Sequence, residues 1–354
     1  MAGVLAPGRD LTSAGFAASG GSGTAVRVLV TGAAGFIGAN LCRELTSRPE
    51  ITEVVGLDNL STGYAANLDE GDAQLVIGSI LDRQLLQDLV DSVDAVVHLA
   101  ARPSVPRSLE DPVASHEVNA SGSLAVLEAC RRRSLHVVAA SSSSVYGSVA
   151  TLPKHEDLAT RPLSPYAASK LAAEAYLLAY RAAFGLPGLA LRFFNVYGPL
   201  QSSRHAYAAV IPAFIDAALR VEPMLISGDG AQTRDFTFVG TVVNVLAEAV
   251  LGRVSSPEPV NLAFGTRTSI LDLARRVAGT VGVPADIRHG PPRRGDVRDS
   301  RADCTRLRQL FPDVTPIALD EGLQQTVDWF RRSAEQATGF ISIHELGVRH
   351  QASQ

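Results

Sequence analysis

Short apolar runs alternate with longer amphipathic stretches along most of the chain, beginning at Val26. The apolar runs are VRVLV, TEVVGL, QLVIGS, DAVVHLA, LHVVAAS and LALRFFNV. Strands that alternate with amphipathic helices predict βαβ units, in which helices cover both faces of a parallel sheet. We therefore expect an α/β fold with a doubly wound Rossmann sheet.

The pattern changes after residue 195, where shorter runs such as MLISG, DFTFV and VNLAF are mixed with helical stretches and with GPPRRGDVR. We predict a Rossmann domain at residues 25–195 and a smaller, interleaved α/β substrate lobe mainly at 196–335, with one strand and one helix returning to the first sheet. Residues 1–24 are rich in Gly, Ala and Ser, and we expect a disordered N-terminal tail there. A C-terminal tail is expected at 336–354.

Composition narrows the class of partner. The 354 residues are 46% hydrophobic, which allows a large core, and the net charge of -4 provides no basic field for nucleic acid or anionic lipid. No apolar run approaches the ~20 residues that span a bilayer. Cys42, Cys130 and Cys304 lack disulfide or zinc-site spacing. We expect a cytoplasmic protein that binds a small metabolite and no metal, nucleic acid or membrane.

The first strand leads into a glycine-rich turn, VRVLVTGAAGFIGANL, with glycines at 32, 35 and 38. Glycine lets the backbone turn tightly, approach a pyrophosphate and bring the helix close to the strand. The N-terminus of the following helix offers free N–H groups to phosphate. The second run ends in GLDNLSTG, where Asp58 can accept hydrogen bonds from a ribose diol and would repel a 2′-phosphate. This pattern predicts an NAD site, although a glycine turn with a capping aspartate is the bland alternative.

Tyr166 and Lys170 are four residues apart in SPYAASKLAAEAY, on one face of a predicted helix. An ammonium near a phenol lowers the pKa of the tyrosine, as would a bound nicotinamide cation, so Tyr166 can act as a base. A serine at the end of the neighbouring strand, ASSSSVYG, can hydrogen-bond the reacting hydroxyl. Such a pair alone is more often a core aromatic and a solvated charge; the serine run and the glycine turn favour catalysis.

Together these motifs resemble the extended short-chain dehydrogenase/reductases, and specifically the NAD-dependent epimerase/dehydratase branch that acts on nucleoside-diphosphate sugars. The resemblance covers the chain from Val26 to about Phe330 and includes TGAAGFIG, LDN, HLAA, SSSSVYG, SPYAASK, LRFFNVYGP and GDGAQTRDF. It implies a catalytic set of Ser142, Tyr166 and Lys170. The NAD-binding residues that it implies, besides Tyr166 and Lys170, are Gly32, Gly35, Phe36, Ile37, Gly38, Asp58, Asn59, Ser61, Thr62, Gly63, Ser79, Ile80, Leu99, Ala100, Ala101, Asn119 and Phe193.

The resemblance also implies a nucleotide-sugar site. In it Asn195 holds the diphosphate, Arg234 and Arg293 clamp it, and Asp296 binds the nucleoside ribose. The full set of implied substrate-binding residues is Ser104, Ser142, Ser143, Tyr166, Asn195, Ala209, Val210, Arg234, Arg293, Asp296 and Ser300. Each of these arginines by itself is more often a solvated surface charge.

The two residues after the catalytic serine narrow the reaction. Dehydratases of the family carry an Asp-Glu pair there, whereas this chain has Ser143 and Ser144, which cannot serve as acid and base at neutral pH. The resemblance therefore favours 4-epimerisation of a UDP-hexose through a transient 4-keto sugar. Ser300 stands where a bulky aromatic excludes N-acetyl groups in some relatives, so we expect UDP-N-acetylglucosamine, UDP-N-acetylgalactosamine, UDP-glucose and UDP-galactose to be accepted.

Other possibilities stay open at this stage. A uronate 4-epimerase, a decarboxylase, a dehydratase or an enzyme for dTDP- or GDP-sugars shares the same motifs. A non-catalytic NAD-binding regulator is a further alternative, because Rossmann folds are reused as sensors. The resemblance also implies a homodimer that pairs through the helix after Asp111 and the helix that carries Tyr166.

Overall fold

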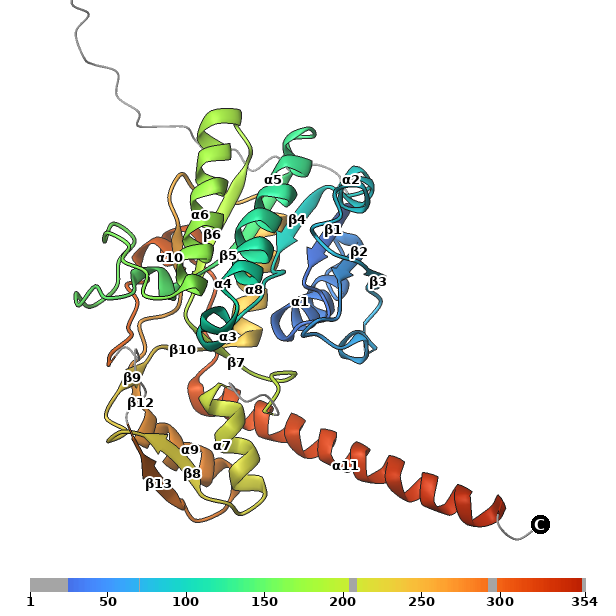
Figure 1. Cartoon of the computed structure of the whole chain (residues 1–354), viewed down its shortest axis with the longest axis vertical. Helices are drawn as coiled ribbons and strands as arrows, with labels where there is room; N and C mark the ends of the chain where they lie inside the picture. The colour runs from blue at the N-terminus through green and yellow to red at the C-terminus, as the bar shows by residue number, and fades with distance from the viewer. Residues whose placement is uncertain (1–24, 70, 204–208, 292–297, 352–354) are drawn as a thin grey trace, which may run out of the picture.

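The computed structural model describes residues 25–69, 71–203, 209–291 and 298–351, with side chains as far as residue 335 (Figure 1). Its centre is a seven-stranded parallel sheet, which confirms the predicted doubly wound Rossmann fold. In spatial order the strands are β11 (Val260–Leu262), β6 (Gly188–Phe193), β5 (His136–Ser142), β4 (Ala95–His98), β1 (Val26–Thr31), β2 (Ile51–Asp58) and β3 (Gln74–Ile77).

Helices cover both faces of this sheet, as the alternation along β1 requires. Val28 and Val30 face one core, which includes α1 (Phe36–Thr46) and α8 (Val239–Leu251). Leu29 faces the other core, between the sheet and α2 (Arg83–Asp91), α5 (Ser123–Arg131) and α6 (Pro165–Phe184). Figure 1 shows α5 and α6 side by side over the sheet.

The helix α6 has strong start and stop signals. Ser164 accepts a hydrogen bond from the backbone N of Ala167 at 3.1 Å, and Pro165 occupies the first turn, where its missing N–H costs nothing. Gly185 ends the helix in the left-handed region at φ 69°. Short helical segments precede it in the chain: α3 (Val105–Glu110), α4 (Pro112–His116), the π-helical η2 (Glu117–Gly122) and η3 (Ser143–Tyr146), while η1 (Ala65–Leu68) follows β2.

Most of the remaining elements lie below the sheet in Figure 1, where short strands form two-stranded pairs, while α10 lies at the level of the sheet against β11. β8 (Met224–Ser227) pairs in parallel with β13 (Ile287–Gly290), β9 (Thr233–Arg234) pairs antiparallel with β12 (Thr268–Ser269), and β7 (Asn195–Tyr197) pairs in parallel with β10 (Phe236–Phe238). The helices are α7 (Val210–Leu219), α9 (Ile270–Val281), α10 (Thr305–Leu310) and α11 (Leu319–Gln351).

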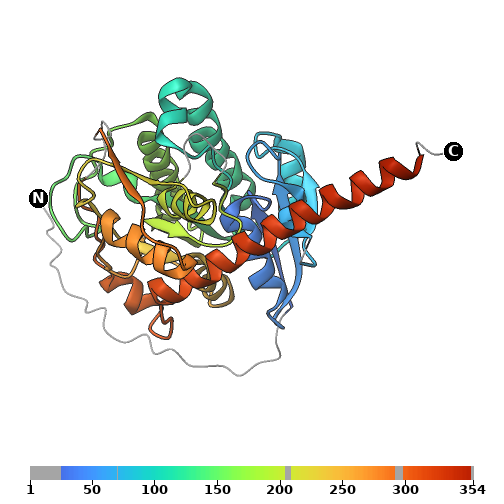
Figure 2. The same cartoon turned by 90° about the horizontal axis from the view of Figure 1, so that it is seen from below.

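The chain crosses between these two regions more than once. After residue 195 it builds lobe elements, yet α8 and β11 belong to the Rossmann sheet and its cover. α11 continues past residue 335, where the sequence suggested a tail, and its far end projects away from the body (Figure 2). The division of the chain into domains stays a prediction.

Candidate active site

A cavity of about 860 Å³ lies at the carboxyl edge of the sheet, where β1, β2, β4, β5 and β6 end. Open parallel sheets bind their ligands at this edge. Most of the expected NAD and catalytic residues line its wall, namely Gly32, Gly35, Phe36, Ile37, Gly38, Asp58, Asn59, Ser61, Thr62, Ser79, Ile80, Leu99, Ala100, Ala101, Ser142, Tyr166, Lys170 and Phe193. Two expected substrate residues, Ser104 and Ala209, line it as well.

The glycine turn is shaped by close backbone contacts. Gly32 has φ +74°, and a Cβ there would lie 2.8 Å from the backbone N of Ala100. A Cβ on Gly38 would collide with the carbonyl oxygen of Gly32. Both positions therefore require glycine, which brings α1 close to the end of β1. Gly63 is not in the cavity wall; a Cβ there would lie 2.6 Å from the carbonyl oxygen of Ala34, so it supports the turn from outside.

Asp58 lies at the end of β2, and its carboxylate is anchored by the backbone. Oδ2 accepts a hydrogen bond from the N of Ala34 at 3.0 Å, and Oδ1 accepts one from the N of Leu60 at 2.8 Å. Each carboxylate oxygen has a second lone pair for a ligand hydroxyl. Asp58 thus links the glycine turn to the second strand while its carboxylate stays at the cavity wall.

The predicted catalytic set is assembled from two elements. Tyr166 and Lys170 come from the first turns of α6, and Ser142 is the last residue of β5. Tyr166 is hydrogen-bonded to Ser142. Lys170 donates from Nζ to the carbonyl oxygen of Ala140 at 2.7 Å and is 6% exposed. A proton acceptor, a hydroxyl donor and a cation therefore share one wall of the cavity.

Burial decides the proton affinities in this set. It raises the pKa of Tyr166, against the hydrogen bond from Ser142, which lowers it. Burial also lowers the pKa of Lys170 to about 8. We expected the lysine to lower the pKa of the phenol; in the protein alone desolvation of the phenolate outweighs that attraction. The positive charge of a bound nicotinamide would lower the pKa of the Tyr166 phenol and so favour its role as a base.

A chain of hydrogen-bonded, buried polar groups adjoins the catalytic set on the side of Lys170. His98 Nδ1 bonds to the hydroxyl of Thr31 at 2.7 Å, and His98 Nε2 bonds to that of Ser123 at 2.8 Å. Burial, together with the charge of Lys170, lowers the pKa of His98 to about 3, so the ring is neutral. Asn119 is not in the wall, and its Oδ1 accepts from the backbone N of Arg102 at 2.7 Å, so it holds a loop that lines the cavity.

Five of the nine expected substrate residues that the structure describes lie apart from this wall. Asn195 donates from Nδ2 to the carbonyl oxygen of Asp235, and Arg234 donates to the carbonyl oxygens of Thr233 and Arg298. The backbone N of Ser300 donates to the carbonyl oxygen of Thr233 at 3.1 Å. The remaining expected residues outside the wall are Ser143, in η3, and Val210, at the start of α7. Arg293 and Asp296 lie outside the described residues.

Sequence reasoning missed two cations in the wall, Arg102 and Arg107. Among the residues that the structure describes, Arg107 has no ion-pair partner, and Arg102 approaches Asp111 only at 3.7 Å. Both flank Ser104, whose φ of +98° is unusual for a residue with a Cβ and is a form of strain found at binding sites. The signal in the sequence was HLAARPSVPRS, in which basic residues directly follow a parallel strand.

The wall includes other residues that were not predicted: Leu57, Tyr64, Asn67, Gly78, Leu81, Val118, Ala140, Ser141, Phe194, Val196, Leu200, Gln201 and Ser202. Within the described ranges, no three His, Cys, Asp or Glu side chains gather as metal ligands would. In that part of the chain, no helix combines the length and the apolar character that a bilayer-spanning segment needs.

Comparison with known proteins agrees with this geometry. The model of the NAD dependent epimerase/dehydratase family matches residues 28–263. The chain belongs to this family. Among curated relatives, the UDP-glucose 4-epimerase of Mycolicibacterium smegmatis is 39% identical over 88% of this chain and the whole of that protein. A UDP-N-acetyl-alpha-D-glucosaminuronate decarboxylase of Bacillus cytotoxicus is 33% identical over 86% of this chain and 98% of that protein.

Solved structures agree with the family assignment. The UDP-N-acetylglucosamine 4-epimerase from Methanobrevibacter ruminantium M1, in complex with UDP-N-acetylmuramic acid, has a TM-score of 0.83 and 33% identity. The match covers 88% of this chain and 99% of that chain. This family member therefore resembles nucleotide-sugar enzymes over nearly the whole of their length, and the relatives perform more than one reaction.

NAD is the cofactor of the family, and the residues of this chain fit it. No side chain that the structure describes caps the start of α1, so the first-turn N–H groups at the wall residues Phe36 and Ile37 can meet a phosphate. The cradle at Gly32 would be filled by a Cβ, and the carboxylate of Asp58 suits a ribose diol. The catalytic phenol lies in the wall of the same cavity.

Proposed function

We propose that the protein is an NAD-dependent 4-epimerase of UDP-hexoses. The observation that carries this proposal is the arrangement of Ser142, Tyr166 and Lys170 in the wall of a cavity suited to NAD. Ser143 and Ser144 follow the catalytic serine, so the chain lacks the acid and base at these positions that eliminate water in dehydratases. Oxidation at one carbon and its reversal need no further acid or base than the serine–tyrosine–lysine set.

In the proposed reaction Tyr166 takes the proton of the C4 hydroxyl, and the hydroxyl of Ser142 donates a hydrogen bond to the same oxygen as it becomes a carbonyl. Bound NAD supplies the acceptor, and afterwards the donor, of the hydride at C4. Lys170 holds a positive charge beside the phenol, which favours the phenolate. The sugar turns in the cavity while its diphosphate stays anchored, and Tyr166 returns the proton to the epimeric hydroxyl.

We also propose that both plain and 2-acetamido hexoses are substrates, because Ser300 is small where relatives with a bulky side chain exclude the acetyl group. Arg234, Arg293, Asp296 and Asn195 are proposed to hold the nucleotide. A homodimer through α4, α5 and α6 is proposed as well. Val113 and Leu109, at the side of this helix layer, are 75% and 64% exposed, so apolar surface is available for a partner.

A second candidate is the same chemistry on a UDP-uronate. Arg102 and Arg107 are the observation that favours it, since a guanidinium in the wall can pair with a sugar carboxylate. Either arginine also suits a phosphate, and plain hexoses therefore stay the primary proposal.

The test is product analysis with UDP-glucose, UDP-N-acetylglucosamine and UDP-glucuronate in separate incubations with NAD. We expect UDP-galactose and UDP-N-acetylgalactosamine to form, and conversion of the uronate alone would replace the proposal by the second candidate. Tyr166→Phe should lower kcat by about a thousandfold, since general-base catalysis contributes about 10²- to 10⁴-fold. Its NAD affinity should stay near that of the unaltered protein. Equal rates in both proteins would end the enzymatic assignment.

A further inference from the structure

Two side chains on α6, four residues apart, contact consecutive residues at the end of β5. Lys170 donates from Nζ to the carbonyl oxygen of Ala140 at 2.7 Å. One turn further along, Oε2 of Glu174 accepts a hydrogen bond from the hydroxyl of Ser141 at 2.6 Å. Ser142, which bonds to the catalytic phenol, is the next residue of the strand. These contacts fix how the catalytic helix lies along the catalytic strand.

Glu174 is held in turn by a buried ion pair. Arg192, on β6, donates from Nη2 to Oε1 at 2.7 Å and from Nε to Oε2 at 3.0 Å. The side chains of this pair are only 4% and 3% exposed. Glu174 is therefore a buried carboxylate with both oxygens occupied, and its partner's charge cancels its own.

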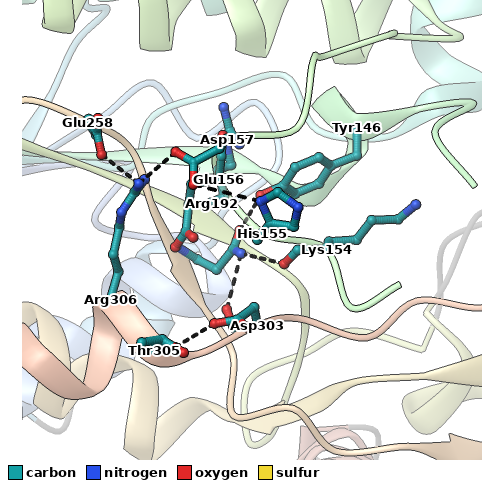
Figure 3. A network of polar contacts seen from close by, with 11 residues as sticks. Tyr146, Lys154, His155, Glu156, Asp157, Arg192, Glu258, Asp303, Thr305 and Arg306 are labelled. Carbon is teal, nitrogen blue, oxygen red and sulfur yellow. Dashed lines mark hydrogen bonds and ion pairs between the residues drawn. The ribbon is translucent and has the colours of Figure 1, made fainter. Parts of the chain in front are cut away.

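Arg192 is itself held in place. Its guanidinium lies over the ring of Tyr146 at 4.8 Å, and Tyr146 donates from its hydroxyl to Oδ1 of Asn261 at 2.7 Å. Asn261 donates from Nδ2 to the carbonyl oxygens of Lys154 and Asp303. Figure 3 shows Arg192 and Tyr146 in this network, which reaches the segment that leads into α10.

A buried ion pair of this kind is not explained by stability. Desolvation of two charges offsets most of their attraction, and apolar residues of similar volume often stabilise a fold as well or better. Glu174 does provide a directional bond to Ser141 at the end of β5, and its carboxylate, paired with Arg192, stands one helical turn along α6 from Lys170. We propose that Glu174, held by Arg192, is a positioning residue of the active site, which fixes Ser141 and Ser142 against α6 and keeps balanced charges beside the Lys170 ammonium.

The balance between the charges of Glu174 and Arg192 can be tested, because few ionisable groups surround Lys170. Those that face it or line the same cavity wall are His98 on β4, Tyr166 and Glu174 on α6, Arg192 on β6, Asp58 at the end of β2, Tyr64, Arg102 before α3 and Arg107 within it. His98 is neutral, and the phenol is protonated near neutral pH because burial raises its pKa. The charges of Glu174 and Arg192 thus oppose each other at Lys170. Removal of Glu174 alone leaves a net cation, which disfavours the ammonium.

The chain contains two lysines, Lys154 and Lys170, so protein labelled at the lysine ε-carbon gives two NMR resonances that can be titrated without substrate. In Glu174→Gln we expect the pKa of Lys170 to fall by about one pH unit, since opposite charges one helical turn apart interact by that order. In Glu174→Gln with Arg192→Met it should return to the value in the unaltered protein. Glu128→Gln, which removes an exposed carboxylate paired with Arg131, is the matched control and should change nothing.

A pKa of Lys170 that is the same in Glu174→Gln and the unaltered protein, or that does not recover in the double variant, overturns the proposal. If Glu174→Gln does not fold, Ser141→Ala provides the second test, because it removes one hydroxyl of the clamp and no charge. Its kcat should fall about tenfold with KM unchanged, and an unchanged kcat also overturns the proposal. This inference rests on the proposed function only for the kcat measurement: absence of turnover on every sugar would end the epimerase proposal, and the titration would still decide the role of Glu174.

Discussion

The NAD-binding Rossmann half and the lobe after residue 195, where the nucleotide-sugar residues are expected, differ in how their expected functional residues are placed. In the NAD-binding half, the glycine turn, Asp58 and the catalytic set all reach one cavity. In the lobe, Arg234 and Ser300 contact backbone carbonyls away from that wall. The difference shows that a site built from strand ends is set by the sheet, whereas the proposed site in the lobe would depend on short elements packed against one another.

The contrast arises from how far apart in the sequence the bonded residues lie. Asp58 is bonded to residues 24 and 2 positions away. Asp235, at the centre of the lobe, is fully buried and accepts hydrogen bonds from Gly265, Thr266 and Ala302. Those partners are 30 to 67 positions away, so no local pattern predicts them.

The largest effect is expected for a substitution in the glycine turn of the NAD-binding half, which should weaken NAD binding. Gly38→Ala places a methyl group against the carbonyl oxygen of Gly32 and 2.9 Å from Cα of Ala33, so α1 must move away from the turn. Such overpacking costs about 3 kcal/mol, which corresponds to roughly a hundredfold in NAD affinity if the bound form bears it. Calorimetric titration with NAD measures this, and a normal affinity would show that the turn tolerates a wider approach.

The sequence predicted the fold well because strand and helix periods are local. Most of the residues expected at NAD line the cavity, since residues after an apolar run lie at the carboxyl edge of a parallel sheet, whereas Gly63 and Asn119 lie outside its wall. Arg102 and Arg107 were missed because a basic residue in a loop is usually solvated. The ion pair of Glu174 and Arg192 was missed because its two residues lie on different elements, and only the packed sheet brings them together.

The next effect tests the lobe, where Ser300 is expected to contact the sugar but does not line the cavity wall. Ser300→Tyr should lower kcat/KM for UDP-N-acetylglucosamine at least about tenfold relative to UDP-glucose, because a steric overlap costs about 1 to 3 kcal/mol. Ser300→Ala, which keeps the space open, is the control and should leave the ratio unchanged. Equal losses for both sugars in the tyrosine variant would place residue 300 away from the acetamido group.

A smaller effect is expected in the pH dependence of turnover, which should affect kcat more than KM. Tyr166 and Lys170 share protons, and the reactive form, phenolate beside ammonium, carries one proton fewer than the acidic form. Because burial lowers the pKa of Lys170 to about 8, kcat should rise with pH and become level above about pH 8, or lower when the nicotinamide cation is bound. KM should change little, since Asn195 and Arg234, which are proposed to hold the nucleotide, lie outside this cavity wall.

Lys170→Met tests the origin of this profile. Only the phenol would then titrate, and burial raises its pKa above the ordinary value near 10, so the rise of kcat should move to pH values above about 10. An unchanged profile in this variant would assign the titration to another group. The NAD affinity of the variant, measured at pH 7, indicates whether the cavity is intact.

The smallest effect is expected for a glycine in the lobe, and it completes the comparison with Gly38. Gly279 lies in α9, it is exposed, and a Cβ there would meet no described atom within 4 Å. Gly279→Ala should raise the free energy of unfolding by about 0.5 to 1 kcal/mol, because alanine loses less backbone entropy in a helix. Turnover and NAD affinity should stay the same. Thermal unfolding of the two alanine variants side by side measures the contrast: a loss of stability in Gly279→Ala would mean that α9 is packed more closely than the lobe's open surface indicates.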